Sequence, residues 1–93
     1  MEKIKDVKIA MIVAASKTLD YLKENKNADI EEVMGHILKE IRADDKAMLG
    51  AIAATNFVYK YKMKHYLASQ KEVMKNLSSS TDMLLEKIEV DTQ

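Results

Sequence analysis

The sequence predicts an all-α fold, a small helical bundle formed by a single domain. Two observations support this class. The chain has no proline and only two glycines, Gly35 and Gly50, so it lacks the turn residues on which most all-β architectures depend. Apolar residues recur every three or four positions over most of the 93 residues, which is the spacing of amphipathic helices.

Two helices are predicted in the first half of the chain. The first covers residues 2–25, where apolar residues follow the helical period. A polar break ends it, and we recognise neither an internal repeat nor a flexible linker. Asp29, with Glu32 three positions later, has the pattern of a capping box. The second helix is therefore predicted over residues 30–42.

A long third helix is predicted over residues 45–77, because no residue between Gly50 and Ser78 would stop it. The polar run from Ser78 to Asp82 has the composition of a turn, and a short last helix is predicted over residues 81–89. The third helix would extend roughly 50 Å, whereas a compact domain of this size has a radius of gyration of about 12–13 Å. We therefore expect a dimer in which long helices from two chains share one core.

The predicted third helix is apolar on two sides, which favours burial on both. Its core face is predicted to contain Met48, Ile52, Thr55, Tyr59, Met63, Tyr66, Gln70, Val73, Met74 and Leu77. The opposite side, which we name the back ridge, is expected to mediate self-association and contains Ala47, Gly50, Ala54, Phe57, Tyr61 and His65. A β-strand is the alternative for residues 57–66, where apolar and basic residues alternate.

The same predicted helix carries a stripe of four lysines in a chain whose 15 basic and 15 acidic residues balance. The stripe consists of Lys60, Lys64, Lys71 and Lys75. One interpretation is a solvated helix face. The other is a surface for an acidic protein or for nucleic acid phosphates. Arg42 is the only arginine, which disfavours nucleic acid because arginine is the better ligand for phosphates and bases.

A short stretch from Leu19 to Val33 is similar in cadence to the first two helices of a helix-turn-helix domain. The resemblance implies a recognition helix rich in polar residues, followed in winged forms by a two-stranded wing. The segment from Lys46 to Ala54 is instead apolar, and no wing with turn residues follows it. A helix-turn-helix protein therefore remains only part of the nucleic-acid alternative.

The sequence offers little for catalysis. It has no cysteine, no glycine-rich phosphate loop and only two histidines. Glu32, His36 and Glu40 share one face of the second predicted helix, but that face points away from the core and would make a shallow metal site. We expect no enzyme activity, no catalytic residue, no metal and no cofactor. His65 on the back ridge is a candidate for pH-sensitive association.

No segment has the length of a membrane span, since the longest uncharged run, Ala47–Tyr59, has 13 residues. The first 16 residues imitate a secretory signal only loosely, so we expect a cytoplasmic protein without membrane partners. Together these features predict a non-enzymatic interaction or regulatory module. It would act through self-association and through helix-face contacts with a protein partner. The alternative is a small dimeric nucleic-acid-binding protein.

Overall fold

The computed structural model describes residues 3–92, with side chains described for residues 3–86. The predicted all-α class is confirmed. The four helices are α1 (Val7–Glu24), α2 (Ile30–Glu40), α3 (Asp45–Lys64) and α4 (Gln70–Thr92). Over this part of the chain the only extended pairing is an isolated bridge between Ile4 and Ala43, so the alternative of a strand over residues 57–66 is wrong.

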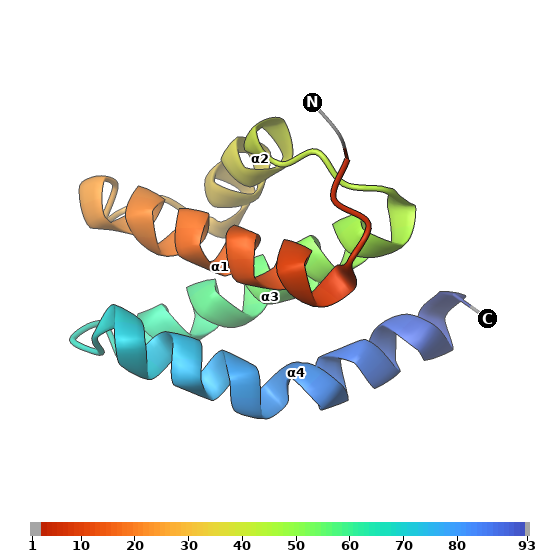
Figure 1. The fold of residues 1–93 in the computed structure, drawn as a ribbon. Helices are drawn as coiled ribbons and strands as arrows, with labels where there is room; N and C mark the ends of the chain where they lie inside the picture. The colour runs from red at the N-terminus through yellow and green to blue at the C-terminus, as the bar shows by residue number, and fades with distance from the viewer. Residues whose placement is uncertain (1–2, 93) are drawn as a thin grey trace.

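The helices form two hairpins, hairpin one (α1–α2) and hairpin two (α3–α4). Figure 1 shows α1 and α3 running side by side in the same direction through the centre, with α2 above them and α4 below. The contact between α1 and α3 is the largest between any two helices. The radius of gyration is 12.5 Å and the longest extent is 36 Å. The core therefore lies around the α1–α3 pair within one chain.

The two hairpins are an internal repeat with an offset of 40 positions, contrary to the sequence-based expectation of no repeat. The backbone turns that join the helices of each hairpin match. The amide of Asn25 donates to the carbonyl of Tyr21 over 2.9 Å, and the amide of His65 donates to the carbonyl of Tyr61 over 2.8 Å. Burial follows the same pattern in both copies. Identical residues occur in the pairs Ala14/Ala54, Tyr21/Tyr61, Ala28/Ala68, Glu32/Glu72, Val33/Val73 and Met34/Met74.

The predicted helix over residues 45–77 is wrong, because the chain turns between His65 and Ser69. α3 ends at Lys64, and the C-cap residue His65 has φ of −133° and ψ of 62°, nearly equal to the −131° and 66° of Asn25, the C-cap of α1. The Ser69 hydroxyl then caps the start of α4 by accepting a hydrogen bond from the amide of Glu72 over 3.1 Å. At 20 residues, α3 is about 30 Å long, so helix length no longer requires a partner chain.

The polar run from Ser78 to Asp82 is not a turn, and the predicted separate helix over residues 81–89 is part of α4. Two hydroxyls in this run bond to carbonyls one turn earlier on the helix. The Ser79 hydroxyl donates to the carbonyl of Lys75 over 3.2 Å, and Thr81 donates to that of Leu77 over 2.9 Å. These bonds satisfy the side chains without interrupting the helix.

The boundaries of the first two helices are narrower than predicted. α1 begins at Val7 rather than residue 2, because the Asp6 carboxylate caps the helix by accepting a hydrogen bond from the amide of Ile9 over 3.1 Å. The preceding residues are extended: the amide of Ile4 donates to the carbonyl of Arg42 over 2.8 Å. This pairing also ends α2 at Glu40. Asp29 caps α2 as expected, accepting the amide of Glu32 over 2.8 Å.

The buried side of α3 is the side with the small residues, and this corrects the predicted core face. Met63, Tyr66 and Gln70 of that predicted face are exposed, whereas Val73 and Leu77 are buried. Small residues allow α1 to approach α3 closely: a Cβ atom on Gly50 would lie 2.5 Å from Cγ1 of Val7. The residues of α3 that are buried are Ala47, Gly50, Ala51, Ala54, Thr55 and Val58.

Candidate interaction surfaces

The back ridge divides into a buried half and an accessible half. Ala47 and Ala54 have no exposed surface and Gly50 is buried, all three on the buried side of α3. These three are therefore not available to a second chain, and the prediction that they mediate self-association is corrected by their burial against α1. The remaining three residues, Phe57, Tyr61 and His65, are half-buried or exposed and lie toward the turn that joins α3 to α4.

Tyr61 joins the two helices of hairpin two. Its hydroxyl donates to Oε2 of Glu72 over 3.0 Å and accepts from the Asn76 amide over 3.1 Å. Its ring stacks on Phe57 with centroids 6.2 Å apart and contacts the His65 ring at 4.8 Å. Partial loss of hydration, and then the bond to Glu72, raise the pKa of Tyr61. The ring therefore holds α3 against α4.

Tyr21 makes the equivalent link in hairpin one. Its hydroxyl donates to Oε2 of Glu32 over 2.7 Å, and this bond is the main cause of a raised pKa for Tyr21. The His36 ring lies 4.3 Å from the Tyr21 ring, and Nε2 of His36 is 4.0 Å from Glu40. Glu32 is thus engaged by a tyrosine. No cluster among the described residues has the three or more ligands that could hold a metal ion.

The four predicted lysines are divided between two helices, Lys60 and Lys64 on α3 and Lys71 and Lys75 on α4, and all four are exposed. They nevertheless share one side of hairpin two. At about 100° per residue, Lys60 and Lys64 lie about 100° and 60° to one side of Tyr61. α4 runs antiparallel to α3, and its Glu72 faces Tyr61. Lys71 and Lys75 lie about 100° and 60° from Glu72 in the same sense of rotation, which places them on the same side of the hairpin as Lys60 and Lys64. We name this surface the basic face.

The repeat shows that the basic face is specific to hairpin two. The equivalent positions of hairpin one hold Asp20, Glu24, Glu31 and Gly35, and all four are also exposed. Residues 60–75 contain five lysines and one glutamate, whereas residues 20–35 contain five acidic residues and two lysines. The two hairpins thus have the same fold, and at three of these four positions they have opposite charge.

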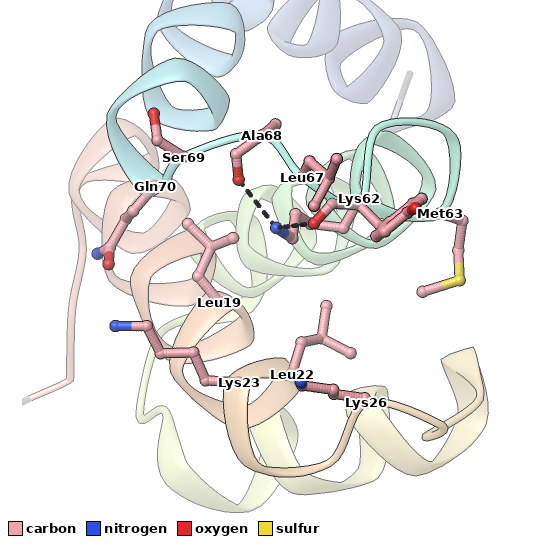
Figure 2. Close-up of a pocket in the computed structure, with 11 residues that line it drawn as sticks. Leu19, Leu22, Lys23, Lys26, Lys62, Met63, Leu67, Ala68, Ser69 and Gln70 are labelled. Atoms are coloured by element: carbon pink, nitrogen blue, oxygen red, sulfur yellow. Dashed lines mark hydrogen bonds between the residues drawn. The ribbon is translucent and has the colours of Figure 1, made fainter.

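Sequence reasoning did not predict the other surface, a groove at the tips of the hairpins that we name the tip groove. Its volume is about 660 Å³. Figure 2 shows Leu19 and Leu22 of α1 on one side of the groove and Leu67 on the other. The Lys62 ammonium donates to the carbonyls of Tyr66 and Ala68, each over 2.9 Å, and so fixes the turn that forms one wall.

Comparison with known protein families, with curated proteins and with solved structures found no match for this chain. Within the described residues, no helix is both long enough and apolar enough to cross a membrane. The basic face and the tip groove are the two candidate interaction surfaces of the described residues.

Proposed function

We propose that the chain is a non-enzymatic interaction module whose basic face binds an acidic surface of a protein partner. The single observation that supports this proposal is the reversal of charge between equivalent positions of the two hairpins. Hairpin one has the same backbone with acidic residues or glycine at those positions, so the hairpin does not require lysine there.

Clustered lysines also have a cost. Like charges on one face repel each other, and at about 0.15 M salt the screening length is about 8 Å, similar to the spacing of side chains one or two helical turns apart. Lysines elsewhere in the chain each have an acidic residue within three positions along the sequence, whereas between Ala51 and Leu77 only Glu72 is acidic. An acidic partner removes this repulsion and gains long-range attraction during encounter.

The partner class is an acidic protein rather than nucleic acid for a chemical reason. A face made only of lysine supplies point charges, whereas recognition of bases and phosphates favours the planar fork of arginine. Arg42, the only arginine of the chain, follows α2 and belongs to the other hairpin. Hairpin one of a second copy offers Asp20, Glu24 and Glu31 as an acidic surface, so self-association through this face is part of the proposal.

The test exchanges residues between the repeats. The variant Lys60→Asp, Lys64→Glu, Lys71→Glu places on hairpin two the residues that hairpin one carries at those positions. The matched control, Lys8→Glu, Lys39→Glu, Lys46→Glu, changes the net charge equally at exposed lysines outside the face. Poly-L-glutamate and a single-stranded oligonucleotide serve as probes, titrated at about 0.01 M and about 0.15 M salt.

We expect poly-L-glutamate to bind the wild type at low salt, and to bind the basic-face variant about tenfold more weakly than the control variant. Equal losses in the two variants would refute the proposal, because net charge alone would then explain binding. If the oligonucleotide stays bound at about 0.15 M salt, where poly-L-glutamate dissociates, the proposal of an acidic protein partner would be refuted in favour of nucleic-acid binding. Light scattering at both salt concentrations measures whether copies associate through the same face.

A further inference from the structure

The tip groove is apolar on the side of hairpin two, and the repeat shows that this is not a requirement of the turn. Met63, Tyr66 and Leu67 have exposed fractions of 49%, 74% and 85%. The equivalent residues of hairpin one are polar or charged, namely Lys23, Lys26 and Asn27. The same bend of the backbone therefore accommodates either set. Three large apolar side chains held in water cost free energy that the fold does not recover.

The floor of the groove is also apolar. Leu19 and Leu22 are only 5% and 6% exposed, and both line the groove beneath the turn at His65–Ser69. Figure 2 shows their side chains directed toward Lys62 and Leu67 across the opening. An apolar chain placed between them would contact aliphatic groups on both sides.

The charged groups of the groove are all cationic. Lys23 and Lys26 of hairpin one line it, and no acidic side chain does. Among the described residues, neither lysine has a side-chain hydrogen bond or an ion pair. Lys62 is different, because its ammonium is already bonded to two carbonyls of the turn. The groove therefore joins an apolar trough to two available positive charges.

The size of the groove indicates the kind of ligand. Eleven residues line it and its volume is about 660 Å³. Small-molecule sites have volumes of about 300–1,000 Å³, whereas a stable protein interface uses about 20–30 residues on each side. We propose that the tip groove binds one molecule of a long-chain carboxylate, an anion with an unbranched apolar chain. The chain would lie between Leu22 and Leu67, and the carboxylate would bind Lys23 and Lys26.

The first experiment needs only the wild-type protein. Laurate, kept below its micellar concentration, is titrated into the protein by calorimetry and by amide chemical shifts. We expect saturable binding of one molecule, with the largest shifts at residues 19–26 and 62–70. Dodecyltrimethylammonium, which has the same chain and the opposite charge, and acetate, which has the head alone, should each bind at least about tenfold more weakly.

The second experiment exchanges residues between the repeats at the groove. Met63→Lys with Leu67→Asn introduces the hairpin-one residues, and Lys23→Met with Lys26→Tyr introduces those of hairpin two. Each double variant should weaken laurate binding by about tenfold or more. Leu38→Ser, which replaces an exposed leucine of α2 by its equivalent in α4, is the control and should leave binding unchanged. Circular dichroism verifies that every variant is folded.

Several outcomes would overturn this inference. Binding of dodecyltrimethylammonium as tight as that of laurate would remove the role of the lysines, and unsaturable binding of many molecules would remove the site. If the protein binds vesicles that contain an anionic lipid but does not bind monomeric laurate, the tip groove would be a membrane-binding surface and not a site for one carboxylate molecule. Because Lys60, Lys64, Lys71 and Lys75 lie outside the groove, these results are independent of the test of the basic face.

Discussion

Replacing Gly50 with alanine tests the closest contact of the fold, between α1 and α3. A Cβ atom at this position would lie 2.5 Å from Cγ1 of Val7, 3.2 Å from Cγ of Met11 and 3.2 Å from the carbonyl oxygen of Val7. Val7 is branched at Cβ and begins α1, and its carbonyl is part of the backbone. A side-chain rotation alone therefore cannot relieve the overlap, and α1 must move.

Two opposing effects determine the sign. Alanine in a helix interior is more favourable than glycine by about 0.5–1 kcal/mol. Inserting a methyl group into a well-packed core costs about 1–3 kcal/mol. Because one contact is with backbone, we expect a cost near the upper end of that range and a net loss of about 2–2.5 kcal/mol in the free energy of unfolding. Gly50→Val should lose more, because it adds two further carbons at the same place.

Gly35 is the internal control. It lies within α2, and a Cβ atom there would meet nothing within 4 Å. Gly35→Ala should therefore gain about 0.5–1 kcal/mol. Urea unfolding followed by far-ultraviolet circular dichroism measures both variants, and for a domain of this size each kcal/mol corresponds to about 4–8 °C in Tm. If Gly50→Ala were as stable as Gly35→Ala, the close approach of α1 and α3 would be refuted.

Three further predictions concern the core, the helix caps and the tyrosines. Ala54→Glu places a charge at a position with no exposed surface and should abolish cooperative thermal unfolding, since an unpaired buried charge costs several kcal/mol out of a total of about 5–15. A folded monomer would contradict it. Asp29→Ala and Ser69→Ala should each lower the free energy of unfolding in urea by about 1 kcal/mol, and no loss would mean that the side chains do not cap. Tyr21 and Tyr61 have pKa values raised above 10.0, so their contribution to stability is complete below pH 10 and is lost as the pH rises through the raised values. The double variant Tyr21→Phe, Tyr61→Phe should therefore show a smaller fall in Tm above pH 10 than the wild type, and an equal fall would assign the effect to other groups.

The sequence predicted those elements that have strong local signals. The helical period and the absence of proline indicated the all-α class, and Asp29 with Glu32 located the start of α2. The turn at residues 65–69 has no glycine or proline, so a local rule extends the helix through it. Its signal is comparative instead: Tyr61, Ala68 and the run after Glu72 repeat the pattern around the turn at residues 25–29.

The buried face of α3 differs from the predicted core face, because the contact of α3 with α1 consists of small residues. Where two helices cross closely, alanine and glycine occupy the contact and larger residues lie at its edges. Ala47, Ala51 and Ala54 have no exposed surface, whereas Met63 is 49% exposed. The lysines of the basic face share one side of hairpin two although the predicted helix is wrong, because Tyr61 faces Glu72 and each pair of lysines lies at the same two angles from one of these residues. The tip groove required the end of α1 to meet the turn after α3, which no local pattern encodes.

The repeat separates what the fold requires from what a binding function requires. Both hairpins are in one chain under the same conditions, so agreement between equivalent positions indicates a structural demand. Tyr21 and Tyr61 agree, and each bonds a glutamate on the following helix. Among the exposed positions that differ, two groups are close in space. The basic face of hairpin two has lysine at the positions of Asp20, Glu24, Glu31 and Gly35, and the tip groove has Met63, Tyr66 and Leu67 at the positions of Lys23, Lys26 and Asn27. Substitutions at these differing positions of the basic face and the tip groove should therefore impair binding and leave stability unchanged.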